Sequence, residues 1–147
     1  MISIKGLRVG LCVAVLVITG LSSGLVTLGN ASATTVPKLV VVPSTNLHNG
    51  EKVRVTGSGF TPGDSVYVVE CLASAKGAAG CNTLGATPAT ISATGLLPKT
   101  SFKVITGKIG NGKCGTKASN LKTCAISAGN ISGGDSAVAH ITFKALG

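Results

Sequence analysis

The residues best suited to chemistry in this sequence are its cysteines. Four of the five form two pairs whose partners lie ten positions apart, Cys71 with Cys81 and Cys114 with Cys124. Zinc ligands usually come in pairs about two to four residues apart, so these spacings do not favour a metal site. An even number of cysteines in an exported chain is typical of disulfides, although four cysteines permit three pairings. We predict two local bridges, each closing a loop rich in Gly, Ala and Ser and each stabilising the fold by roughly 2–4 kcal/mol.

Catalytic groupings are hard to build from the other polar residues. His48 lies in an Asn-Gly turn, and His140 occupies the outward face of a predicted strand, so both are expected at the surface. The exported part of the chain contains no G-x-S-x-G elbow. Gly57-Ser58-Gly59 lacks the Gly-Lys-Ser/Thr ending of a phosphate loop. The sequence therefore favours a protein that is not an enzyme, with no catalytic residue, no cofactor and no metal.

The N-terminal segment has the features of a secretory signal. It begins with two basic and no acidic residues, continues as an apolar run over 9–28 and ends in an A-x-A site. An uncleaved membrane anchor is the alternative, since the run is about long enough to span a bilayer. Its glycines and small-residue site favour cleavage instead. We expect a signal peptide at 1–33 and an exported domain at 34–147, located outside the cell or in its envelope. The residues that define the cleavage site are Ala31, Ala33 and Thr34.

The exported domain is strongly basic. The chain has 13 basic and 4 acidic residues, and the signal contains two of the basic ones, which leaves the domain with a net charge of +7. Such a charge favours loose attraction to anionic surfaces. Direct nucleic-acid binding would need aromatic platforms among the lysines, and the chain has only three Phe and one Tyr. We interpret the lysines as a solvated face that makes weak contacts with an anionic cell envelope.

Short β-branched runs separated by glycine and proline predict an all-β fold. The spacing of seven such runs is typical of a two-sheet sandwich. They cover residues 39–43, 52–56, 65–70, 89–93, 101–106, 125–128 and 137–144. The chain has no Trp, so we expect a light aliphatic core that the disulfides reinforce. The predicted core residues are Val40, Val53, Val55, Val66, Val68, Phe102, Val104, Ile126, Ile141 and Phe143.

A glycine pattern leads into the first cysteine pair. The motif P-S-x-x-L-x-x-G is followed by V-x-V-x-G-x-G, a further glycine and a cysteine, without gaps from Pro43 to Cys71. This pattern resembles the neocarzinostatin family of enediyne-carrying apoproteins, as do the first cysteine spacing and the Asn that follows Cys81. The resemblance implies an immunoglobulin-like sandwich whose end cleft holds a reactive, DNA-cleaving chromophore near the first disulfide. The later segments that resemble the family's middle and closing strands are 93–95, 100–104 and 141–143.

Two positions depart from the way in which that family binds its ligand. The family grips its chromophore with aromatic side chains, and the register around the first cysteine pair places two of them at Ala73 and Ala86. A methyl group offers much less contact area than an aromatic ring. The second cysteine loop is also longer than the family's, and the family is commonly acidic. The resemblance therefore supports the family's fold for this chain more strongly than it supports the family's ligand.

The sequence favours a secreted, monomeric binding protein that holds a small apolar ligand in an end cleft. The predicted lining is Leu72, Ala73, Leu84 and Ala86. A structural or interaction protein of the cell envelope, with no small ligand, is the alternative from another class. Carriage of a true chromophore, with antibiotic activity and contact with DNA only through that chromophore, is a third interpretation.

Overall fold

The computed structural model describes residues 35–145, which form nine strands and three short 3-10 turns. The predicted signal peptide at 1–33 and the cleavage position before Thr34 lie outside the described residues. Among residues 35–145, no helix has the length and apolar character needed to cross a membrane.

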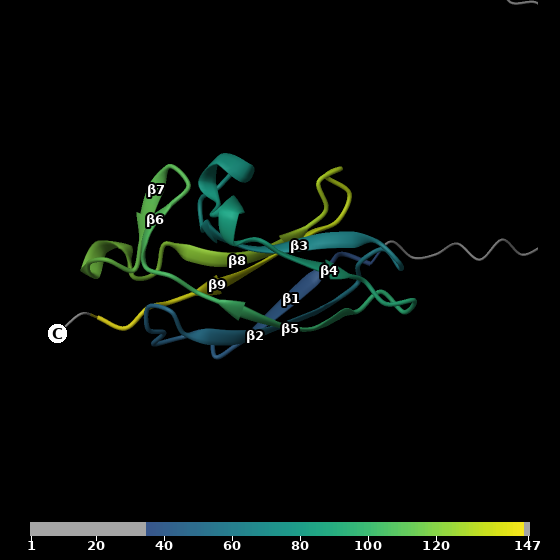
Figure 1. Cartoon of the computed structure of the whole chain (residues 1–147), viewed down its shortest axis with the longest axis horizontal. Helices are drawn as coiled ribbons and strands as arrows, with labels where there is room; N and C mark the ends of the chain where they lie inside the picture. The colour runs from purple at the N-terminus through teal and green to yellow at the C-terminus, as the bar shows by residue number, and fades with distance from the viewer. Residues whose placement is uncertain (1–34, 146–147) are drawn as a thin grey trace, which may run out of the picture. The chain divides into compact units, whose positions relative to one another are not determined.

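Seven of the nine strands form a sandwich of two antiparallel sheets (Figure 1). The three-stranded sheet has the order β1-β2-β5 and consists of β1 (Lys38–Val42), β2 (Lys52–Ser58) and β5 (Leu97–Lys103). The four-stranded sheet has the order β4-β3-β8-β9 and consists of β3 (Ser65–Leu72), β4 (Thr87–Thr90), β8 (Cys124–Gly129) and β9 (Ser136–Ile141). The predicted seven-stranded sandwich is therefore confirmed.

The other two strands, β6 (Gly107–Ile109) and β7 (Gly112–Cys114), pair with each other as a separate hairpin. This hairpin was not among the predicted strands because each arm is only three residues long and contains one apolar side chain at most besides cysteine. Its loop begins at Gly110, whose φ of 52° favours glycine. A glycine at the first position of a two-residue loop is a hairpin signal that the sequence does contain. The three 3-10 turns are η1 (Ala78–Gly80), η2 (Thr83–Gly85) and η3 (Ala118–Asn120).

Alternation of side chains decides which face of each sheet is buried. On β2, Val53 and Val55 are buried while Lys52 and Arg54 are exposed. Successive strand residues point to opposite faces, so this pattern directs the valines between the sheets and the basic residues outward. The same rule holds for β3, where Val66 and Val68 are buried.

The first strand is the exception among the predicted core positions. Val40 is 54 % exposed, whereas Val41 is only 6 % exposed. The prediction that Val40 lies in the core is therefore wrong by one position, and a one-residue error exchanges the two faces of a strand. Three consecutive valines provide no alternation from which to choose the face. The other nine predicted core residues are buried.

Two of the predicted strands are displaced along the chain. The strand predicted at 89–93 occurs as β4 at Thr87–Thr90, and the one predicted at 101–106 occurs as β5 at Leu97–Lys103. In β5 the buried Leu97 begins the strand, and the register with β2 shifts between Val55 and Gly57. Such an irregularity breaks the alternation on which the prediction relied.

Candidate functional site

The outward face of the four-stranded sheet has its shortest side chains on the inner strand β8. Ala125, Ser127 and Gly129 occupy this face, and they alternate with Ile126 and Ala128, which are buried between the sheets. Ala125 is fully buried, whereas Ser127 and Gly129 are half-buried, so the accessible part of this row lies at Ser127 and Gly129.

Larger side chains flank this row on both neighbouring strands. Val69 of β3 and Val138 of β9 are paired with Ser127 from opposite sides, and Tyr67 is paired with Gly129. Tyr67 is 38 % exposed and Val138 is 54 % exposed. The outward face is therefore apolar and accessible at its edges. We call the face formed by Tyr67, Val69, Ser127, Gly129 and Val138 the β8 face.

The segments that project from the sandwich stand on the same side as this face. In Figure 1 the β6–β7 hairpin, the turns η1 and η2 and the loop between β8 and β9 all rise from the four-stranded sheet, away from β1, β2 and β5. The hairpin is tied to the η1 segment, since the backbone N–H of Asn111 donates to the carbonyl of Ala79 at 3.0 Å. Gly112 lies against Leu72, because a Cβ at this glycine would come within 2.6 Å of the leucine side chain. The hairpin and the first cysteine loop thus support each other.

Both predicted disulfides are formed between near neighbours. Cys71 at the end of β3 is bonded to Cys81, and Cys114 at the end of β7 is bonded to Cys124 at the start of β8. The first bridge closes the loop that contains η1, and the backbone N–H of Asn82 returns to β3 by donating to the carbonyl of Glu70 at 2.8 Å. The second bridge joins the hairpin to the four-stranded sheet. Each bridge therefore fixes one of the segments that surround the β8 face.

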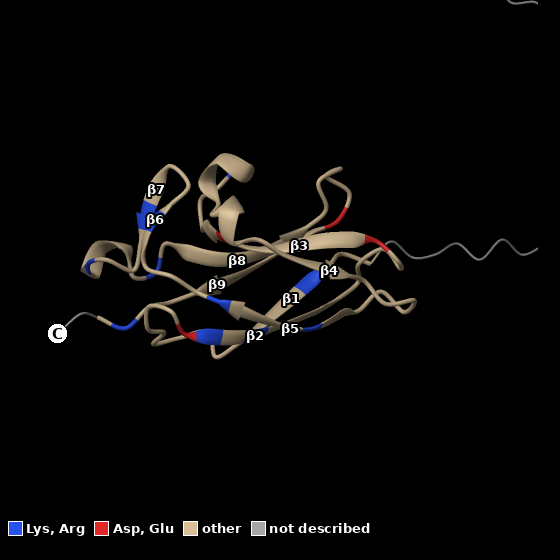
Figure 2. Ribbon diagram, viewed as in Figure 1, with Lys and Arg blue, Asp and Glu red and all other residues tan. Residues whose placement is uncertain are grey.

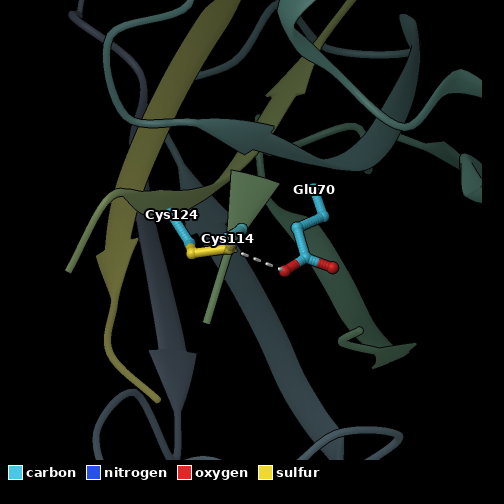
Figure 3. A group of neighbouring side chains, drawn as sticks. All are labelled: Glu70, Cys114 and Cys124. Carbon is cyan, nitrogen blue, oxygen red and sulfur yellow. Dashed lines mark hydrogen bonds between the residues drawn. A yellow bond between two sulfur atoms is a disulfide. The ribbon is translucent and has the colours of Figure 1, made fainter. Parts of the chain in front are cut away.

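A buried carboxyl group lies beside the second disulfide (Figure 3). Glu70 is 0 % exposed and continues the inward row of β3 that contains Val66 and Val68. Its Oε2 accepts a hydrogen bond from the backbone N–H of Ile105 at 2.9 Å, and its Oε1 lies 3.7 Å from Sγ of Cys114. The side chain therefore connects β3, the segment before the hairpin and the hairpin itself.

Burial sets the protonation of this group. Burial, opposed by the hydrogen bond from Ile105, raises the pKa of Glu70 from 4.5 to about 7. A disulfide sulfur carries no hydrogen, so any proton in the contact with Cys114 belongs to the carboxyl group. Oε of Glu70 and the sulfurs of Cys114 and Cys124 lie within 4.8 Å of one another. In the disulfide these sulfurs are bonded to each other and do not supply the thiolates that a metal ion would need.

The other three acids of the chain take part in hydrogen bonds that hold loops. Asp135 accepts from the backbone N–H of Thr61 at 2.5 Å, and Asp64 accepts from the Asn130 side chain at 2.6 Å. Glu51 accepts from the backbone N–H of His48 at 2.8 Å. The two aspartates join loops that are distant in the chain, and Glu51 closes a local turn, so all three acids have a structural role. His48 and His140 are both exposed, as the sequence predicts.

Comparison with known proteins identifies the architecture. The model of the neocarzinostatin family matches residues 39–143, which span both sheets, the hairpin and both disulfides. The chain belongs to the neocarzinostatin family. The resemblance recognised in the glycine and cysteine pattern is thereby confirmed.

Relatives in this family include macromomycin from Streptomyces macromomyceticus, which is 33 % identical over 129 residues, or 84 % of this chain and 88 % of the relative. The antitumor antibiotic C-1027 apoprotein of Streptomyces globisporus is 32 % identical over 115 residues, or 78 % of each chain. Actinoxanthin from the same organism is also 32 % identical over 115 residues. The solved structure of macromomycin superimposes with a TM-score of 0.57 and 31 % identity, covering 73 % of this chain and 98 % of macromomycin.

The four ligand-binding residues predicted from the sequence occupy different settings in the family fold. Leu72 is half-buried against the hairpin, and Ala73 is half-buried where its N–H donates to Thr123 at 2.8 Å. Ala86 is half-buried immediately before β4, whereas Leu84 is 100 % exposed on η2. All four belong to the segment that borders the β8 face, and their role in binding stays a prediction.

The sequence does not predict the β8 face as a binding site, because none of its residues belongs to a recognisable motif. Ala125 and Ser127 belong to the strand predicted at 125–128, in which Ile126 is the predicted core residue, and Gly129 lies just beyond its predicted end. The pairing that places Tyr67 and Val138 beside them is a tertiary property. Two depressions occur elsewhere on the described residues. One, of about 420 Å³, lies on the outward face of the three-stranded sheet, and the other, of about 290 Å³, lies near Leu47 and Phe143.

Proposed function

We propose that this family member is a secreted, non-enzymatic binding protein that holds a small apolar ligand on the β8 face. The observation that carries the proposal is the row of small residues on β8, flanked by apolar side chains and bordered by two disulfide-anchored segments. Binding sites for small molecules are mostly apolar with a few polar groups, and Ser127 supplies one such group among Tyr67, Val69 and Val138. One relative is named as the apoprotein of an antitumor antibiotic, and an apoprotein is the protein part of a complex with a bound non-protein group.

The ligand is expected to differ from a large polycyclic chromophore. Ala73 and Ala86 replace aromatic side chains of the family pattern, and each loses the flat contact area of a ring. The bordering segment then makes fewer contacts with a ligand, and the affinity rests more on the sheet itself. We therefore favour a compact apolar molecule over an enediyne. Chromophore carriage would instead give an adduct that absorbs visible or near-ultraviolet light and cleaves DNA when released.

Native mass spectrometry of the protein from its own culture medium tests the proposal. A discrete adduct that denaturation releases would identify the ligand. The same spectrum reports export, since cleavage before Thr34 gives a chain that is four hydrogens lighter than its reduced form when both bridges are present. A chain that begins at Met1 would contradict the signal peptide, and an adduct-free spectrum would favour the envelope interaction protein.

A matched pair of variants tests whether the ligand binds on the β8 face. Ser127→Phe fills the β8 face, whereas Ser101→Phe adds the same ring to the outward face of β5 in the other sheet. We expect the adduct to disappear from the first variant and to persist in the second. Equal retention in both variants would remove the β8 face from consideration. Thermal unfolding of both variants controls for misfolding.

A further inference from the structure

The outward face of the three-stranded sheet collects positive charge. Its exposed basic residues come from all three strands, and Figure 2 shows blue segments on β1, β2 and β5. The basic residues of this face are Lys38, Lys52, Arg54, Lys99 and Lys103. They account for five of the eleven basic residues in the domain, and we call this set the basic face.

The strand register places like charges against each other on this face. Lys52 of β2 is paired directly with Lys103 of β5. Like charges in directly opposed positions destabilise a sheet. Arg54 lies two positions further along β2, roughly 7 Å from Lys52. Repulsion of this kind is relieved when a negatively charged partner covers the face.

The acids of the chain do not neutralise the basic face. Glu70 is buried between the sheets, and Asp64 and Asp135 hold loops at the ends of β3 and β9. Glu51, just before β2, accepts a hydrogen bond from the backbone of His48. Each of the four carboxylates is thus engaged with a partner other than the basic side chains, including that of Glu51, which adjoins Lys52 in the chain.

A depression of about 420 Å³ lies within the basic face, and its lining includes Lys52, Arg54, Lys99 and Ser101. Three cationic groups and a hydroxyl group around one hollow form a suitable environment for a phosphate oxygen. Val42 contributes an apolar wall on the β1 side. The lining therefore matches the chemistry of a charged group attached to a short aliphatic unit.

We propose that the basic face binds a flexible phosphodiester polymer of the cell envelope. The three Phe side chains of the chain are buried and its one Tyr is on the other sheet, so the face has no platform for stacking bases. The projecting segments stand on the opposite sheet, so no helix or ribbon is available to enter the groove of a duplex. A lipid surface would favour an aromatic or broad apolar contact, whereas the exposed large apolar side chains of strands β1, β2 and β5 are Val40 and Val42. A flexible polyanion satisfies the charges without any of these features.

Affinity for poly(glycerol phosphate) tests the proposal, measured by biolayer interferometry on the oxidised, secreted protein. We expect binding that weakens roughly 20- to 100-fold between 50 and 200 mM NaCl, as for about three to five phosphate contacts. The triple variant K52Q/R54Q/K99Q should lose at least tenfold in affinity at 50 mM NaCl. The control K108Q/K113Q/K117Q removes the same charge from the hairpin and the η3 segment and should lose less than threefold. Equal losses in the two variants would show attraction by net charge alone and overturn the proposal.

Further measurements test which polyanion is the partner and whether the variants remain folded. Absence of binding by the unmodified protein, or tighter binding to duplex DNA or to phosphatidylglycerol vesicles at the same phosphate concentration, would overturn the choice of polymer. The variant K52Q/K103Q removes the like-charged pair and should weaken binding without lowering the melting temperature. The β8-face variant Ser127→Phe should bind the polymer unchanged, so that failure of the ligand proposal and failure of this one are separate results.

Discussion

Replacing Glu70 by Gln should change how stability depends on pH. The folded protein holds this carboxyl at a pKa of about 7, against 4.5 for the unfolded chain, because the side chain is buried. Below pH 4.5 both states are protonated and the group causes no loss of stability. As the pH rises from 4.5 to 7, the unfolded state releases a proton that the folded state retains, so stability falls. The loss is complete above about pH 7.

The size of the effect follows from the pKa difference. A shift of one unit corresponds to about 1.4 kcal/mol, so the rise from 4.5 to about 7 amounts to about 3 kcal/mol. Gln cannot ionise, yet its carbonyl can accept the N–H of Ile105 and its amide can face Cys114. We therefore expect the unfolding free energy of Glu70→Gln, minus that of the unmodified protein, to increase by about 3 kcal/mol between pH 4 and pH 8.

Urea denaturation of the oxidised proteins at pH 4, 5, 6, 7 and 8 measures this difference. Subtracting the unmodified protein at each pH cancels the titration of every other group. The control Glu51→Gln alters a carboxyl group in contact with solvent, for which we expect the difference to change by less than about 1 kcal/mol. A flat difference for Glu70→Gln would refute a buried, neutral carboxyl group. A decrease with rising pH would mean that the folded state stabilises the charged form.

Three further predictions concern the fold, and urea denaturation measures each of them. Val41→Ala should lose about 1–2.5 kcal/mol through a core cavity, whereas Val40→Ala should lose less than about 0.5 kcal/mol, and equal losses would contradict the observed facing of β1. Gly110→Ala should lose at least about 1 kcal/mol, because its φ is 52° and its Cβ would meet the backbone of the η1 segment; an unchanged stability would mean that the hairpin does not rest there. Replacing Cys114 and Cys124 by Ala should lose about 2–5 kcal/mol, and a smaller loss would show that the hairpin is held by other contacts.

The facing of a strand can be predicted from the sequence where polar and apolar residues alternate along it. On β2 a basic residue alternates with each valine, so Val53 and Val55 were assigned to the core correctly. On β1 three valines in a row leave the facing undetermined, and Val40 was assigned to the wrong side. The disulfides could be predicted from spacing because each closes a short loop of small residues.

Glu70 shows how an interior position can be missed although the pattern indicates it. Val66 and Val68 alternate as inward residues, and the same period continued for two positions places the carboxyl group inside. Acidic residues are rarely fully buried, so the residue type alone does not suggest the interior position that the periodicity indicates. The inward position is tolerated because the N–H of Ile105 supplies a partner and the disulfide of Cys114 fills the space beside it.

The candidate sites depend on pairing between distant strands, which local sequence does not encode. Ser127 acquires its neighbour Val138 from the next strand along the chain, but its neighbour Val69 comes from β3, which is tens of residues away. Lys52 meets Lys103 for the same reason, since β2 and β5 are not consecutive in the chain. In each case the residue types could be read from the sequence, but their grouping required the sheet order.

The two faces of the sandwich are chemically distinct because the fold constrains only the inward side of each sheet. Inward residues must be apolar or paired, as Val55 and Glu70 illustrate, whereas outward residues can change without loss of the core. Here the four-stranded sheet presents small and apolar groups between disulfide-anchored segments, and the three-stranded sheet presents five cations without a matching acid. A ligand on the first face and a polyanion on the second would not compete for the same residues. One molecule could therefore remain attached to an anionic polymer while it holds an apolar ligand, and the proposed carrier and envelope functions are compatible in a single domain.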